Sequence, residues 1–395
     1  MTVSFRFCLA ILSLIPAAHA FADSGDPVAV RRWAGATISL ETMWDLNLVI
    51  DTTGEASDKL KNSASKVVSF SDEVQHVLHR KPNSSEVLWE RLTTATKVEP
   101  NAVTVTSFKI KDAAAGWAIQ VAVDDVSVLC VDLNSIPKDT TKAAGSVGKQ
   151  DVVIVNANDV ANLNQPQVKQ FLEALSPQSI VANPNFDAGE TADDFKAAMK
   201  AEFAAVESAH NTLAIAAGSK KTDGYQFFSL ADKPEAMPTE LADLFLRMES
   251  SCAQSQKVFA KLSTSQMNWK PSNGTHTPRW NTEHMMGRQL LFFSQIYKAL
   301  DPAIPALNLN PKQMPADYKY AHQDWTGAEE ALQMERVSKF TRRFAYLMHD
   351  LDVNRRAPGS RWPTLKALLL QMENHYSEHT ANTVKKFDLE DWPKQ

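Results

Sequence analysis

The stretch QMENHYSEH, residues 371–379, places two histidines four positions apart, at His375 and His379. On an α-helix, residues i and i+4 lie on one face with Cβ atoms about 5–6 Å apart, so two imidazoles can reach the same metal ion. A third histidine, His284, ends the stretch WNTEH at residues 280–284. A histidine from a neighbouring helix would complete a three-ligand site with an open position, as catalytic metals have. The pattern therefore predicts a metal-binding helical bundle in the last third of the chain.

The sequence around these histidines is almost purely helical in pattern. Four helices are predicted: from Thr239 to about Leu262, from about Asn281 to Leu300, from the capping box at 326–329 to near His349, and from Pro363 to a point before Trp392. A long connection that contains Pro302, Pro305, Pro311 and Pro315 joins the second helix to the third. Four helices, one long crossover and inward-pointing histidines are typical of a four-helix bundle with a metal site.

The chain before residue 231 has a different character, with short strands first and alternating helices and strands later. Strands are predicted at 37–40, 46–50, 103–110, 117–123, 126–132, 151–155, 179–182, 213–217 and 224–230, and helices at 165–174 and 191–209. The strands that flank Asp124 and Asp125 are predicted to form a hairpin. This order indicates layered α/β sheets.

The first residues have the pattern of a secretory signal. Arg6 precedes an apolar run at 7–18, which is too short to span a bilayer, and Ala18-His19-Ala20 matches a cleavage site. We expect a signal peptide at 1–20 and a secreted or periplasmic location. Two domains are then expected, an α/β domain at 21–232 and a helical bundle at 238–395, joined by the Pro-containing segment 231–238.

Composition bounds the function further. The 395 residues carry a formal net charge of −5, with 22% charged residues, and show no basic stripe for nucleic acid. We expect a small-molecule partner of unknown identity, no later membrane span, and a homodimer as an open alternative. Once Cys8 is removed with the signal, Cys130 and Cys252 remain, and they are expected to stay unpaired. Whether either thiol is reactive is left open.

Three segments of the helical half resemble the DinB-like (DinB/YfiT) family of metal-binding four-helix bundles. They are MNWKP at 267–271, TPRWNTEH at 277–284 and the HxxxH at 375–379, and the resemblance covers about residues 238–391. It implies that His284, His375 and His379 are the metal ligands, with Zn²⁺ or Ni²⁺ as the expected cation. Some family members are transferases that use low-molecular-weight thiols, so the resemblance also implies a thiol-dependent reaction as one option.

The N-terminal half is similar, more weakly, to the metallo-β-lactamase superfamily. The resembling segments are 33–41, 48–51, 128–132 and 176–185. The resemblance implies an αββα-type layered sandwich. Where the family has its metal-binding histidines this chain has other residues, namely Phe70, Asp72, Val74, Gln75, and Asn183 or Asn185, and Asp132 alone matches a ligand. Without imidazoles a dinuclear zinc site cannot assemble, so this domain is expected to be a scaffold or binding module.

Two classes of function remain open. The first is a metal-dependent hydrolase or thiol transferase that acts on a small molecule through the histidine triad. The second is a non-catalytic envelope or extracellular binding protein whose metal is structural or absent. In that alternative His375 and His379 are solvated and His284 is a core residue. His276, His322 and His349 are predicted to be surface or loop residues with no ligand role.

Overall fold

The computed structural model describes residues 27–42, 46–71, 75–80, 87–91, 102–109, 116–123, 126–185, 190–216, 225–272, 274–307 and 323–394. The predicted signal peptide, the turn at Asp124-Asp125, His322, and Pro311 and Pro315 of the crossover lie outside the described residues.

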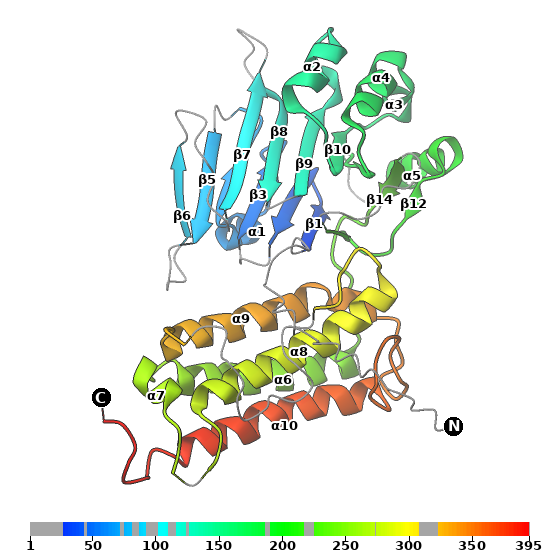
Figure 1. Cartoon of the computed structure of the whole chain (residues 1–395). Coiled ribbons are helices and arrows are strands. Elements are labelled where there is room, and N and C mark those ends of the chain that lie inside the picture. The colour runs from blue at the N-terminus through cyan, green and yellow to red at the C-terminus, as the bar shows by residue number, and fades with distance from the viewer. Residues whose placement is uncertain are drawn as a thin grey trace, which may run out of the picture.

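Two β-sheets form the first half of the chain (Figure 1). The strands are β1 (Val28–Trp33), β2 (Thr37–Glu41), β3 (Asn47–Asp51), β4 (Lys66–Val68), β5 (Gln75–Arg80), β6 (Val87–Arg91), β7 (Ala102–Lys109), β8 (Gly116–Val123), β9 (Val126–Asp132), β10 (Val152–Asn156), β11 (Ser179–Ala182), β12 (Val206–Glu207), β13 (Thr212–Ile215) and β14 (Gln226–Ser229). The smaller sheet has the order β13-β1-β2-β3-β4, and the larger has the order β12-β14-β11-β10-β9-β8-β7-β5-β6. The predicted hairpin is confirmed, because β8 and β9 pair antiparallel up to Val123 and Val126.

The two sheets pack face to face, and helices cover their outer faces. Valine, isoleucine and leucine side chains from both sheets share one buried cluster between the layers. A second cluster joins the outer face of the larger sheet to α2 (Thr140–Val147), α3 (Val160–Asn164), α4 (Pro166–Leu175) and α5 (Glu190–Phe203). On the smaller sheet, Leu60 of α1 (Asp58–Ser63) packs against Val49 of β3. The predicted αββα-type layering is therefore confirmed.

The helix predicted at 191–209 was too long. Helix α5 ends at Phe203, where Ala204 adopts a positive φ of 47°, and the chain then enters the short strand β12. The Ala-rich composition favours a helix throughout this segment, but the pairing of Val206 and Glu207 with β14 requires extended backbone.

The second half is a four-helix bundle of α6 (Thr239–Phe259), α8 (Pro278–Leu300), α9 (Gly327–Arg343) and α10 (Leu365–Val384). Helices α6 and α8 each contact both α9 and α10, which closes the bundle around one apolar core. In Figure 1, α10 lies on the side of the bundle away from the sheets. A short helix α7 (Thr264–Asn268) and a 3₁₀ turn, η2 (Ala345–Met348), complete this half. No helix among the described residues is long and apolar enough to cross a bilayer.

Helix ends in the bundle follow capping chemistry, and two of the predicted helix starts were wrong. Helix α8 begins at Pro278, three residues early, because Thr277 accepts a hydrogen bond from the backbone N–H of Trp280 and caps it. Helix α10 begins at Leu365 rather than Pro363, since Thr364 supplies the cap, and it ends at Val384, before Trp392 as predicted.

The third helix shows one prediction confirmed and one corrected. The capping box of Thr326 and Glu329 is present at the start of α9. A Cβ at Gly327 would lie 1.9 Å from the carbonyl oxygen of Phe259, so only glycine lets this end approach α6. The helix ends at Arg343 rather than near His349, because the chain tightens into η2.

The two halves contact each other through the smaller sheet. Ala29 of β1 and Ala214 of β13 belong to the same buried cluster as the bundle core. Arg31 donates to the carbonyl oxygen of Arg343 at 3.0 Å, and Glu41 lies within ion-pair distance of both arginines. The segment 231–238 carries no helix or strand, as the sequence predicts.

Candidate metal centre

The structure brings His284 of α8 together with His375 and His379 of α10. One ring nitrogen from each of the three lies within 4.8 Å of the others. The ring centroids of His375 and His379 are 4.6 Å apart, and His284 lies 4.9 Å and 5.1 Å from them. The i, i+4 spacing on α10 and the early position of His284 on α8 produce this convergence.

All three imidazoles are held in the neutral form that metals require. Burial lowers the pKa of His284 and of His375 to about 3, and that of His379 to about 4. Charge on neighbouring histidines lowers these pKa values further: His379 acts on His284 and His375, and His276 acts on His379. Nδ1 of His284 is buried and has no hydrogen-bond partner. Three neutral imidazoles with an unsatisfied buried nitrogen fit a divalent cation and oppose a protonated cluster.

A chain of hydrogen bonds through Asn281 and Thr383 orients the ring of His379. Nδ1 of His379 lies 3.0 Å from Oδ1 of Asn281, and because an amide oxygen only accepts, the ring nitrogen donates. The amide of Asn281 is fixed in turn by donating to Thr383 Oγ1 at 2.8 Å, and Thr383 donates to the carbonyl oxygen of His379. This arrangement leaves Nε2 of His379 free of a proton and available as a ligand, as outer partners do in known metal sites.

An aromatic stack covers one side of the cluster. The ring of Trp280 lies nearly parallel to that of His284, with centroids 4.4 Å apart, and His276 stacks on its other face at 3.6 Å. His276 is exposed, as predicted, and does not belong to the group of converging nitrogens. Trp280 is part of the motif that resembles the DinB-like family, but no contact with the triad was predicted for it. Its position four residues before His284, on the same helix face, is the signal that could have indicated this contact.

The histidine pKa values predict an acid-dependent loss of stability in the metal-free protein. In the unfolded chain these groups have a pKa of about 6.5, whereas the folded values are about 3 to 4. Below pH 6.5 the unfolded state therefore binds more protons, and the free energy of unfolding falls as the pH decreases toward 4. Chemical denaturation of wild type and His375→Ala across this range measures the effect. The variant should show a shallower decline, and equal slopes would contradict the burial of neutral imidazoles.

A second group of converging side chains corrects one prediction. His349 was predicted to be a surface residue, but only 9% of it is exposed, because η2 turns it toward the N-terminal half. It lies with His210 and Glu235, and one ligand atom from each falls within 4.8 Å of the others. The three residues come from distant parts of the sequence, so no local spacing could reveal the group.

The two cysteines that the structure describes are unpaired and buried, as predicted. Burial raises the pKa of Cys130 to about 12 and that of Cys252 to about 11. Thiols with such pKa values carry little thiolate at neutral pH, so neither residue is a candidate nucleophile.

The N-terminal half has a hollow where the lost metal site was expected. It measures about 300 Å³, and Phe70, Asp132 and Asn185 are among its lining residues. Its described lining contains no histidine or cysteine. Asp132 caps the 3₁₀ turn that follows β9, accepting from the N–H of Asn134 and from the Ser135 hydroxyl. The described lining therefore offers no imidazole or thiolate for a zinc site, in agreement with the sequence.

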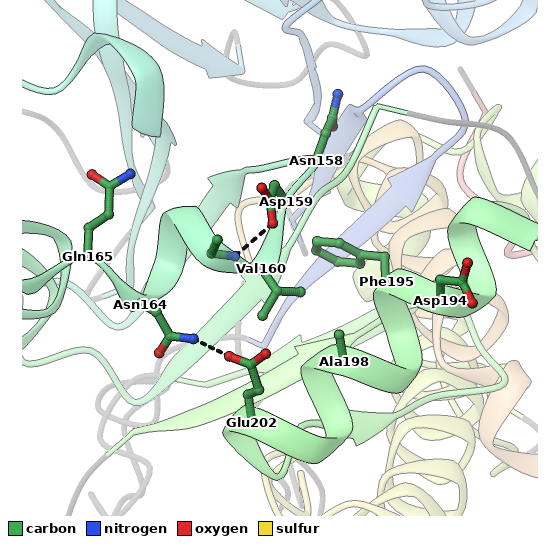
Figure 2. A pocket seen from close by; sticks show the side chains of 10 residues that line it. Asn158, Asp159, Val160, Asn164, Gln165, Asp194, Phe195, Ala198 and Glu202 are labelled. Atoms are coloured by element: carbon green, nitrogen blue, oxygen red, sulfur yellow. Dashed lines mark hydrogen bonds between the residues drawn. The ribbon is translucent and has the colours of Figure 1, made fainter.

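A larger hollow, of about 590 Å³, lies beside α3 and α5 (Figure 2). Two of its acidic groups are engaged locally: Asp159 accepts from the N–H of Ala161 at the start of α3, and the Asn164 amide donates to Glu202. The hollow is lined by residues of the N-terminal half, whereas the histidine triad lies on α8 and α10 of the bundle. Among the described residues, the triad gathers three potential metal ligands, whereas the larger hollow is lined by no histidine or cysteine. The triad is therefore the better candidate for a functional site.

Comparison with solved structures finds metallo-β-lactamase fold proteins similar to the N-terminal half. A metallo-β-lactamase superfamily protein from Thermotoga maritima is 11% identical, covers 51% of this chain and 98% of its own, and has a TM-score of 0.33. The metallo-β-lactamase fold protein YhfI from Bacillus subtilis is 9% identical. The match covers 53% of this chain and 98% of YhfI, with a TM-score of 0.27. The metallo hydrolase Igni18 from Ignicoccus hospitalis is 8% identical. The match covers 49% of this chain and 100% of Igni18, with a TM-score of 0.27. The layering of this half rests on its own sheet order and core.

No curated protein matches the chain in sequence. Among protein families, the DinB superfamily matches residues 247–382. This range contains all three histidines of the triad and most of the four helices that surround them. The helical half of the chain therefore contains a DinB superfamily domain, and that domain carries the triad.

Proposed function

We propose that the DinB superfamily domain binds one divalent metal, Zn²⁺ or Ni²⁺, through His284, His375 and His379, and presents it to a small-molecule substrate. The observation that carries the proposal is the convergence of three ring nitrogens within 4.8 Å on imidazoles that burial keeps neutral. Three protein ligands leave at least one coordination position open, which distinguishes catalytic from structural zinc sites.

The reaction that suits such a site is hydrolysis or thiol transfer. A divalent metal at an open site acts as a Lewis acid and lowers the pKa of a water or thiol that it binds. The chain supplies the surroundings: Asn281 fixes the ring of His379, and Trp280 excludes water from one side of His284. The charge of Arg288, which acts on both His284 and His375, would favour a substrate with an anionic group.

The experiment that tests this function probes the open position. Cobalt-loaded protein should change its visible absorption when a small thiol such as 2-mercaptoethanol, or azide, is added, because an exogenous ligand enters the coordination shell. The metal-free protein should remain folded by circular dichroism. If neither ligand changes the absorption spectrum and the protein unfolds when the metal is removed, the metal is structural and the non-catalytic alternative holds.

We also propose that the protein is exported, on the basis of the basic residue, apolar run and A-x-A pattern in its first 20 residues. The mature protein isolated from producing cells should then begin at Phe21. An intact Met1 on that protein would refute cleavage.

A further inference from the structure

The group of His210, Glu235 and His349 lies where the two halves of the chain meet. His210 is in the loop between β12 and β13, Glu235 is in the linking segment 231–238, and His349 directly follows η2 in the bundle. The backbone around the group is fixed: the N–H of Ala231 donates to the carbonyl oxygen of His210, and that of His349 donates to Tyr346. Three separate segments thus deliver three donor groups to one place.

The distances within this group fit a metal shell. Nδ1 of His210 lies 3.3 Å from Oε2 of Glu235, and Nδ1 of His349 lies 3.5 Å from the same oxygen. Ligand atoms at zinc distances of about 2.0–2.1 Å in a tetrahedron stand about 3.3 Å apart. The two imidazole rings are nearly perpendicular, at 86°, with centroids 6.0 Å apart, so both nitrogens can face one centre without ring overlap.

The same nitrogens lack an adequate partner within the protein. Nδ1 of His210 and Nδ1 of His349 are both buried, and beyond their approach to Glu235 neither has a hydrogen-bond partner among the described residues. Buried polar atoms of this kind are rare and call for an unseen partner. An ion pair with Glu235 would require protonated rings; burial nevertheless lowers the pKa of His349, outweighing the raising effect of Glu235, and favours its neutral form. A neutral imidazole is the form that ligates a metal.

We propose that His210, Glu235 and His349 form a second metal site, which binds a zinc-class divalent cation and clamps the linking segment between the two halves. Two imidazole nitrogens and one carboxylate oxygen are a donor set that zinc accepts readily. Glu235 is the exposed member, with 45% of its side chain accessible, so a water molecule can complete the shell from that side. This site shares no residue with the triad and stands whether or not the triad binds a metal.

The test uses the full chain with His284→Ala and His375→Ala, so that zinc cannot bind at the triad. After equilibrium dialysis against Zn²⁺, metal analysis should find one zinc per chain, and Zn²⁺ should raise the midpoint of thermal unfolding. Adding His349→Ala should remove both the bound zinc and the thermal shift. Adding Glu235→Gln should weaken binding, whereas Glu240→Gln, a matched exposed carboxylate that pairs with Lys366, should not.

Two results would overturn the second site. One is a folded background variant that retains no zinc. The other is zinc that persists undiminished after His349→Ala, which would identify adventitious binding elsewhere. If His349→Ala does not fold, the test rests on Glu235→Gln, because this exposed side chain can change without disturbing the core. Equal zinc affinity with and without Glu235→Gln would then overturn the proposal.

Discussion

Replacing His375 by alanine should weaken metal binding at the triad by more than about 100-fold while the bundle stays folded. Loss of an outer partner of a ligand alone costs about 10–100-fold in affinity, so loss of a direct donor should cost more. His375 contributes one of three converging nitrogens and lies against both other rings. The Kd for Zn²⁺ should be measured by competitive titration in a His349→Ala background, so that the second histidine group does not contribute.

Two further variants show whether the loss of affinity depends on the role of each residue at the site. Asn281→Ala leaves all three ligands but removes the bond that orients His379, so a loss of about 10–100-fold is expected. His276→Ala is the matched control, because this exposed ring stacks on Trp280 beside the triad without joining it. Its Kd should stay near the wild-type value. An affinity of His375→Ala equal to that of His276→Ala would remove His375 from the site.

Replacing Arg279 by methionine should lower the free energy of unfolding by about 3–5 kcal/mol. Arg279 is completely buried at the start of α8 and donates to Glu330 Oε1 of α9 and to Asn268 Oδ1, each at 2.6 Å. Burial, and secondarily the nearby Glu283, raise the pKa of Glu330 to about 7, while Arg279 opposes that rise. Without the guanidinium, the Glu330 carboxyl stays buried and loses its ion-pair partner. Urea denaturation measures the loss.

The controls for this ion pair separate burial from charge. Arg355→Met removes an arginine whose side chain is 84% exposed and pairs with Asp352, so a change within about 0.5 kcal/mol is expected. The double variant Arg279→Met with Glu330→Leu should recover part of the stability, since the Glu330 carboxyl that lost its partner is then absent. If Arg279→Met lost no more than Arg355→Met, the buried pair would not be an anchor between α8 and α9.

The sequence predicts those parts of the fold that depend on local geometry. The hairpin of β8 and β9, the capping box at Thr326 and the layered order of strands and helices are confirmed. The approach of His375 to His379 also follows from local spacing, and in the structure His284, the third histidine predicted from the sequence, lies beside them. Metal binding by the triad itself stays a prediction, and so do the domain limits at 21–232 and 238–395.

What the sequence could not predict depends on contacts between distant segments. The end of α5 is set by strand pairing of Val206 and Glu207, which overrides helix propensity. The pairing of Arg279 with Glu330 joins residues 51 positions apart on different helices. His349 is buried because η2 packs against the N-terminal half, so a residue with an unremarkable local context becomes part of a candidate site. Such partners are fixed by packing, for which single-chain patterns carry no signal.

Metal binding by the triad of the DinB superfamily domain can be tested with a crystal of the protein grown with Zn²⁺ and measured at the zinc absorption edge. We expect an anomalous peak at about 2.0–2.1 Å from one nitrogen each of His284, His375 and His379. Well-ordered density for these three rings with no anomalous peak among them, in crystals that hold zinc elsewhere, would contradict it.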